Sequence, residues 1–200
     1  ENFDETRIQR YIEVLEQISM RLKTLTEDVV EASKITSGNI KLECMKLDFT
    51  ELVLQTSAEY EEKFEERNLT EIQHLPKEKA LVYIDGRRTW RILANLYKNA
   101  AKYAMTGSRI YTDLKVTEGA VIFSIKNISE QPLNINADQL TERFIRGDIS
   151  RSTEGSGLGL SIAQTLTEMQ KGKFELYLDG DLFKATVTFP KVQEEQSTQI

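Results

Sequence analysis

Residues 95–103 have the sequence NLYKNAAKY, and the spacing of their polar side chains decides how the rest of the chain is interpreted. The segment lies in a predicted helix over residues 87–104, where Asn95 and Asn99 are four positions apart and share one face. An amide oxygen is a hard ligand that suits Mg²⁺, and Lys102 lies close enough along the helix to reach a phosphate. Taken alone, these residues are equally well explained as the polar stripe of an amphipathic helix.

A second motif, GSGLGL at residues 155–160, opens a predicted helix that runs to about Gln170. Glycines allow backbone amides to approach an anion, and a helix N-terminus adds unpaired N–H groups and the positive end of a dipole. The motif follows a long loop rather than a strand and lacks the Lys-Ser/Thr ending of a P-loop. A glycine-rich hinge without a ligand is the alternative. The amides concerned belong to Gly155, Ser156, Gly157, Leu158, Gly159 and Leu160.

A third cluster, ERFIRGD at residues 142–148, lies in the long polar loop just before these glycines. Loops of this length in a compact domain are usually functional. Phe144 is an apolar anchor, and Arg146 and Arg151 are positioned to meet a polyphosphate. A solvated charge cluster explains Arg151 almost as well, and Arg146 less well.

The remaining segments predict an α+β fold, with helices on one face of a mixed sheet. A short strand is expected over residues 40–45, followed by a helix from the N-cap Asp48 to about Arg67. Further strands are expected over 80–84, 109–114 and 120–126, and over 173–178 and 182–189 as a closing hairpin. His74 is expected in an exposed polar loop.

The first 38 residues predict one long helix with a narrow apolar seam. Its members are three and four positions apart in alternation, which is the spacing of a coiled coil. From residue 4 to 33 such a helix is about 45 Å long, which is more than a small domain can cover. A partner helix is therefore favoured over packing on the chain's own domain. The seam consists of Ile8, Tyr11, Leu15, Ile18, Leu22, Leu25 and Val29.

Composition excludes several classes of function. The net charge of −6 does not favour nucleic acid or an anionic membrane, because both attract clustered Lys and Arg. One cysteine, Cys44, allows no internal disulfide, and one Cys with one His makes a zinc site improbable. The chain contains no signal peptide and no apolar run long enough to span a membrane. Its abrupt charged start predicts a piece of a longer protein.

Together and in this order, the three motifs resemble the ATP-binding domain of sensor histidine kinases. That domain belongs to the superfamily of gyrase, the heat-shock chaperone ATPases and the mismatch-repair ATPases. Residues 91–103 resemble its N box, 142–148 its F box and 155–160 its G2 box. The resemblance covers about 45–190, and residues 22–38 resemble the end of the second dimerisation helix.

The resemblance implies a two-layer sandwich of a mixed sheet and about three helices, the Bergerat fold, preceded by the coiled-coil-like helix. It implies ATP and Mg²⁺ as ligands. Asn99 would bind the metal with support from Asn95, Lys102 would contact phosphate, and Tyr103 would pack near the adenine. Arg146 and the amides of residues 155–160 would hold the triphosphate. Residues 129–154 would form the lid over the nucleotide.

One position departs from the family pattern. The G1 box normally reads Asp-x-Gly-x-Gly, and its Asp accepts a hydrogen bond from the adenine amino group. Here the strand ends Asn127-Ile128-Ser129-Glu130, with neither glycine. The side-chain oxygen of Asn127 can accept the same bond, although without charge. The departure bears on nucleotide affinity and on movement of the lid.

The expected activity is transfer of the γ-phosphate of ATP to a histidine on a dimerisation helix that this chain lacks. Two alternatives remain: a degenerate module that only dimerises or binds nucleotide, and an ATPase or serine kinase of the same superfamily. The second alternative needs a Glu as general base where this chain has Asn95.

The resemblance also implies the organisation and partners of the protein. Residues 1–38 are expected to be the second dimerisation helix, 39–192 the catalytic domain and 193–200 a frayed tail. Expected partners are a second copy, through the N-terminal helix, and a response regulator. Neither nucleic acid nor the membrane is expected to contact this part. It would be the cytoplasmic portion of a membrane-anchored bacterial sensor.

Overall fold

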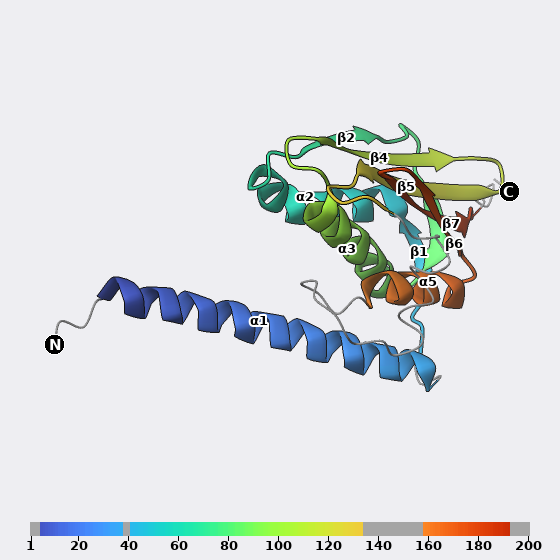
Figure 1. Ribbon diagram of the computed structural model, residues 1–200. Helices are drawn as coiled ribbons and strands as arrows, with labels where there is room; N and C mark the ends of the chain where they lie inside the picture. Colours follow the sequence, from blue (N-terminus) through green and yellow to red (C-terminus); the bar gives the residue numbers. More distant parts are fainter. Residues whose placement is uncertain (1–4, 38–40, 134–157, 193–200) are drawn as a thin grey trace, which may run out of the picture.

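The computed structural model describes residues 5–37, 41–133 and 158–192. A five-stranded sheet with the order β2-β4-β5-β7-β6 forms one layer (Figure 1). β2 pairs with β4 in parallel, and each of the other neighbouring pairs is antiparallel. The strands are β2 (Thr70–His74), β4 (Arg109–Val116), β5 (Ala120–Ile128), β6 (Lys173–Asp179) and β7 (Leu182–Pro190). A separate antiparallel pair joins β1 (Met45–Asp48) to β3 (Leu81–Ile84).

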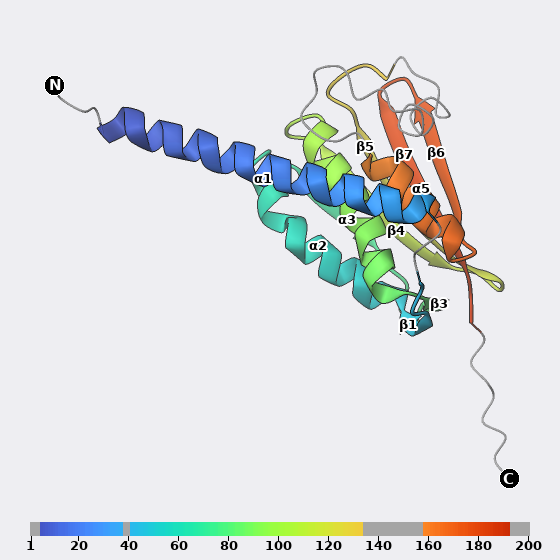
Figure 2. The same cartoon turned by 90° about the horizontal axis from the view of Figure 1, so that it is seen from below.

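Helices form the second layer, on one face of the sheet. These are α2 (Phe49–Glu65), α3 (Gly86–Tyr103) and α5 (Gly159–Met169). The long helix α1 (Glu5–Thr36) lies across this helical layer on the side away from the sheet, and its N-terminal half projects beyond the domain (Figures 1 and 2). The expected two-layer α+β architecture with a long N-terminal helix is confirmed.

Side-chain caps fix where α2 and α3 begin. Asp48 accepts a hydrogen bond from the backbone N–H of Thr50, and Asp85 accepts one from that of Arg88. These bonds satisfy amides that the first turn of a helix leaves unpaired. Asp48 also accepts from the N–H of Ala80 just before β3, so one carboxylate orders two elements.

Aromatic rings fill the space between sheet and helices. Phe49 of α2 packs edge-on against Phe189 of β7, with ring centroids 5.6 Å apart, and both side chains are fully buried. Gly172, between α5 and β6, is required by this packing. A Cβ there would lie 2.7 Å from the Phe189 ring, which is too close for any side chain.

Two strands differ from the sequence prediction. β1 begins at Met45, because residues 41–44 adopt no regular structure. β2 was missed, and His74 is its last residue rather than part of a loop. The inward-facing residues of β2 are Glu71 and Gln73, which are polar and hydrogen-bonded to one another and to Ser57. A strand with a polar inner face lacks the apolar alternation that sequence patterns detect.

The seam of α1 is exposed along most of its length. Of its seven residues only Leu25 is half-buried, and the rest are exposed. The C-terminal part of α1 contacts the domain through a different face, around the buried Asp28. In the part of the chain that the structure describes, no helix is both long and apolar enough to cross a membrane.

Candidate functional site

Helix α3 carries most of the residues singled out from the sequence. Asn95 is buried at 8% exposure, Asn99 and Lys102 are half-buried, and Tyr103 at the end of the helix is 37% exposed. The Lys102 ammonium lies 4.6 Å from the centre of the Tyr103 ring, a cation–π distance. The predicted placement of these four side chains on one helix is confirmed.

Three polar atoms at this site are buried without a hydrogen-bond partner among the described residues. They are Asn95 Nδ2, Lys102 Nζ and Asn127 Oδ1. Buried polar groups in native proteins are almost always paired, since an unpaired one costs roughly 1–3 kcal/mol. Elsewhere in the described chain only Thr50 and Ser108 have such an atom. The orphaned atoms therefore gather at the predicted nucleotide residues.

The N-terminus of α5 faces α3 at Asn95. An ideal Cβ on Gly159 would lie 3.5 Å from Asn95 Oδ1, so the first turn of α5 packs directly on that amide. The N-cap residue, Leu158, supplies no side-chain hydrogen bond to this turn. The leading amides of α5 thus receive no side-chain cap from the N-cap residue, and they lie beside Asn95 at the positive end of the helix dipole.

Asn127 reaches the site from the sheet. It lies near the end of β5, pairs with Ile110 of β4 and Phe183 of β7, and is 3% exposed. The strand continues toward the end of α3, where the N–H of Met105 donates to the carbonyl of Ile128 at 2.8 Å. Asn127 and Lys102 therefore lie on elements that are joined directly.

Several predicted residues fall outside the described parts of the chain. These are Arg146, Gly155, Ser156 and Gly157, together with most of the proposed lid (134–154) and the tail at 193–200. Leu158, Gly159 and Leu160 are described and form the start of α5. Within the described residues, no three His, Cys, Asp or Glu side chains are grouped so that they could hold a metal ion. The amide oxygen of Asn99 is a ligand of the type that Mg²⁺ accepts.

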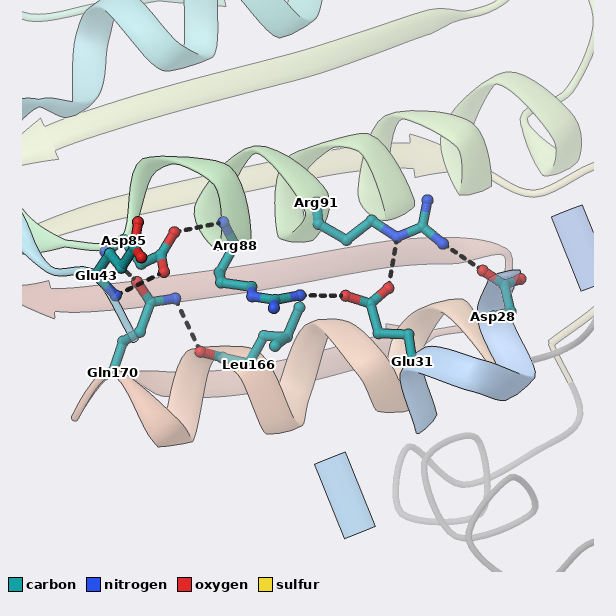
Figure 3. Close-up of polar contacts among 8 residues, drawn as sticks. All are labelled: Asp28, Glu31, Glu43, Asp85, Arg88, Arg91, Leu166 and Gln170. Carbon is teal, nitrogen blue, oxygen red and sulfur yellow. Dashed lines mark hydrogen bonds and ion pairs between the residues drawn. The ribbon is translucent and has the colours of Figure 1, made fainter. Parts of the chain in front are cut away.

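The other half of α3 is bound to α1 by ion pairs (Figure 3). Glu31 of α1 bridges Arg88 and Arg91 of α3, with each N···O distance 3.0 Å, and Arg91 also pairs with Asp28. All four side chains are less than one-quarter exposed, so solvent screens these pairs only in part.

A second polar network fixes the N-terminus of the same helix. The backbone N–H of Asp85 donates to Gln170 Oε1 at 2.7 Å, and the Gln170 amide donates to the carbonyl of Leu166 in α5 (Figure 3). The Asp85 carboxylate in turn accepts from the N–H of Glu43 at 2.9 Å. These bonds hold α3 and α5 in a fixed relative position, which sets the distance across the site.

The ion pairs between α1 and α3 were not predicted from the sequence. The only signal was that Asp28 and Glu31, like Arg88 and Arg91, are three positions apart and so share one helix face. Nothing in the sequence says which two helices meet. Arg67, which donates hydrogen bonds to the carbonyls of Ala101 and Lys102 at the end of α3, was missed for the same reason.

The sequence profile of the histidine kinase-, DNA gyrase B- and HSP90-like ATPase family matches residues 84–196. The chain is similar to the sensor protein KdpD of Clostridium acetobutylicum, with 28% identity over 90% of this chain and 20% of that protein. It is 30% identical to the histidine protein kinase SaeS of Staphylococcus aureus, over 92% of this chain and 54% of that protein. The chain thus spans about a fifth to a half of the length of these curated relatives.

Solved structures share the fold. ShkA in complex with AMPPNP matches with a TM-score of 0.76 and 20% identity, over 93% of this chain and 40% of that chain. The histidine kinase ThkA in complex with response regulator protein TrrA matches with a TM-score of 0.72 and 23% identity, over 92% and 52%. The chain therefore belongs to the histidine kinase-, DNA gyrase B- and HSP90-like ATPase family, as an ATP-binding catalytic domain of the histidine kinase type.

Proposed function

We propose that this domain binds ATP with Mg²⁺ between α3, α5 and the end of β5, and transfers the γ-phosphoryl group to a histidine on a separate helix. The observation that carries the proposal is the set of three orphaned polar atoms on Asn95, Lys102 and Asn127. A nucleotide would offer hydrogen-bond partners both to the two donor nitrogens, on Asn95 and Lys102, and to the acceptor oxygen of Asn127. Phosphate oxygens accept from Lys102, and the adenine amino group donates to Asn127.

Each residue has a distinct task in this reaction. Asn127 orients the base, and Lys102 holds phosphate together with the leading amides of α5. Asn99 would hold Mg²⁺, which when bound supplies positive charge against the phosphates. The nitrogen lone pair of the acceptor imidazole attacks the γ-phosphorus, the bond to the bridging oxygen breaks, and ADP leaves. Arg146 and residues 155–157 would complete the phosphate contacts.

Asn95 distinguishes this reaction from hydrolysis or serine phosphorylation. An amide cannot remove a proton from water or from a hydroxyl group at neutral pH. A neutral imidazole already has a lone pair and does not need a general base. The proposal therefore favours histidine as acceptor over an ATPase or a serine kinase.

We propose the following place for this domain in a longer protein. Residues 1–38 form the second helix of a dimerisation domain, 39–192 the catalytic domain and 193–200 a tail, and the acceptor histidine lies on a first helix outside this sequence. Two copies associate through α1, whose apolar seam is exposed. The phosphoryl group then passes to a response regulator. Use of ATP and a single unpaired cysteine, Cys44, favour the cytoplasmic side of the membrane.

Calorimetric titration with ATP, with and without Mg²⁺, tests the proposal. The parent chain should bind ATP more tightly when Mg²⁺ is present, and Asn99→Ala should remove that difference. Gln55→Ala, which deletes an exposed amide on α2, is the control and should keep it. Equal affinity with and without Mg²⁺ in the parent would contradict the metal assignment. The absence of ATP binding would favour the alternative of a non-catalytic module.

A further inference from the structure

We propose that Arg67 is a positioning residue of the nucleotide site, an inference that rests on the function proposed above. Its guanidinium group joins the last turn of α3, which carries Lys102 and Tyr103, to Glu130 on the segment that follows Asn127. Arg67 would thereby set the position of the phosphate-binding lysine relative to the adenine-binding asparagine, without touching the nucleotide.

One arm of the guanidinium caps the end of α3. Arg67 Nη1 donates to the carbonyl of Ala101 at 2.8 Å and also to the carbonyl of Lys102. The last carbonyls of a helix have no partner within it and form the negative end of the helix dipole. A cation there stabilises the final turn, and this turn holds the backbone of Lys102.

The other arm holds the end of the neighbouring strand. Arg67 Nη2 lies 2.6 Å from Glu130 Oε2 and 3.1 Å from Thr106 Oγ1. The backbone N–H of Glu130 donates to the carbonyl of Tyr103 at 2.9 Å. Glu130 is therefore tied to the α3 terminus twice, once by its backbone and once through Arg67.

The backbone of Arg67 is itself fixed. It follows the C-cap of α2, its N–H donates to the carbonyl of Phe64, and its carbonyl accepts from the N–H of Gly107 at 3.2 Å. With its side chain about one-quarter exposed, this arginine is a rigid support rather than a free surface group. Only a planar fork reaches all of these oxygens at once, so lysine is a poor substitute.

The contact between Arg67 and Glu130 bears on the nucleotide site because Glu130 lies on the segment that follows Asn127. The segment from Asn127 to Glu130 contains no glycine. An ion pair and a backbone bond fix it where a flexible hinge would let it move. Lys102 Nζ and Asn127 Oδ1, both buried and unpaired among the described residues, lie on the two elements that Arg67 and Glu130 hold together. A loss of this bridge would change their relative position more than their chemistry.

The test compares Arg67→Ala, Arg67→Lys and Glu130→Gln with the parent chain by calorimetric titration with MgATP, and follows thermal unfolding of each variant without nucleotide. Arg67→Ala should lower the affinity for MgATP about tenfold or more, which is the effect of misaligning one charge-assisted hydrogen bond. Arg67→Lys and Glu130→Gln should have smaller effects. Arg109→Ala removes an exposed arginine at the start of β4 and should bind like the parent.

Chemical rescue separates positioning from general stability. Methylguanidinium at millimolar concentration should restore MgATP binding to Arg67→Ala and leave Arg109→Ala unchanged. A folded Arg67→Ala that binds MgATP like the parent would overturn the proposal. If Arg67→Ala does not fold, parent-like affinity in both Arg67→Lys and Glu130→Gln would overturn it instead. A parent chain that does not bind ATP contradicts the proposed function itself, which is a different result.

Discussion

Asn127 is 3% exposed, and its side-chain oxygen has no partner in the described parts of the chain. We predict that this oxygen accepts a hydrogen bond from the adenine amino group. Asn127→Ala should therefore weaken ATP binding by about 1–3 kcal/mol, the cost of an unpaired buried polar group. Asn127→Asp should bind ATP as well as the parent or better. A buried carboxylate should lower the stability of that variant in the absence of nucleotide.

The measurement for Asn127 is a titration with ATP and with GTP, together with thermal unfolding of the nucleotide-free proteins. GTP offers a carbonyl oxygen where adenine has its amino group, so the parent should discriminate against it and Asn127→Ala should discriminate less. Ser124→Ala, a substitution on the opposite face of the same strand, is the control. If both Asn127 variants bind ATP like the parent, the assignment of this residue to the base is wrong.

Side chains whose neighbours lie close in the sequence could be predicted to share a face, whereas those with distant partners were missed. Asn95, Asn99 and Lys102 were singled out by helical spacing, and Tyr103 by the resemblance of the same segment to the N box. Arg67 is 63 positions from Glu130, and no periodic pattern connects them. Contacts of that kind depend on how elements pack, which the spacing within one element does not contain.

Ion pairs between charged side chains join helix α1 to helix α3. Asp28 and Glu31 meet Arg88 and Arg91 in a partly buried network, where a lost partner leaves a charge unpaired. We predict that Glu31→Ala releases the C-terminal part of α1 from the domain and speeds amide hydrogen exchange there. A double-mutant cycle of Glu31→Ala with Arg88→Ala should give a coupling energy of about 0.5–3 kcal/mol.

Glu27→Ala is the matched control for this network, because Glu27 is an exposed carboxylate on the same helix. It should leave hydrogen exchange of α1 unchanged. Since exposed ion pairs contribute little, a coupling energy close to zero between Glu31 and Arg88 would mean that solvent screens the network and that α1 docks by other contacts.

The apolar seam of α1 is exposed along most of its length. Apolar side chains in a heptad pattern stay exposed only at a cost, so two chains should associate through them. Leu15→Asp with Leu22→Asp should raise the dimer dissociation constant at least about tenfold, measured by sedimentation velocity over a range of concentrations. Gln17→Asp adds a charge off the seam and is the control. A parent chain that stays monomeric at high concentration would contradict the prediction.

Among the elements, the strongly periodic ones were predicted and the irregular ones were not. The helices and the two hairpins follow apolar patterns, and the structure confirms them with shifts of a few residues at their ends. β2 was missed because its inner face carries Glu71, whose carboxylate accepts hydrogen bonds from Tyr97 and Thr112 at 2.8 and 2.6 Å. Those bonds replace apolar burial, and they exist only once α3 and β4 are in place.

One face of α3 connects α1 with the residues that we propose for the nucleotide site. Arg88, Arg91, Asn95, Asn99 and Lys102 follow one another at steps of three or four, so they form a continuous stripe. The first two form ion pairs with α1, and the other three are the residues that we propose for the nucleotide site. A shift of α1 against the domain therefore acts on the same helix that carries the predicted phosphate and metal ligands.

We predict from the position of His74 that this chain gains no acid-labile phosphate when it is incubated with MgATP. His74 is the only histidine in the sequence. It lies at the end of β2, where Nδ1 is 2.7 Å from Asp113 Oδ1. Asp113 also pairs with Lys126, and although burial raises its pKa, hydrogen bonds from His74 and Lys126 outweigh this and lower it. The carboxylate therefore stays ionised and holds the imidazole.

The sheet itself separates His74 from the nucleotide site. His74 is paired with Asp113, an odd number of residues from Ile110, which pairs with Asn127, so His74 and Asn127 point to opposite faces. Phosphoryl transfer depends on an in-line approach of the acceptor, and an imidazole on the far face of the sheet cannot make it.

The measurement is incubation with radiolabelled ATP, with His74→Ala as control. A separate chain that carries an acceptor helix should become labelled in trans. This labelling should be weak, because the acceptor is no longer tethered to the domain. Label on His74 itself would require the domain to reach a second copy's outer sheet face, and would contradict this assignment of acceptor and site.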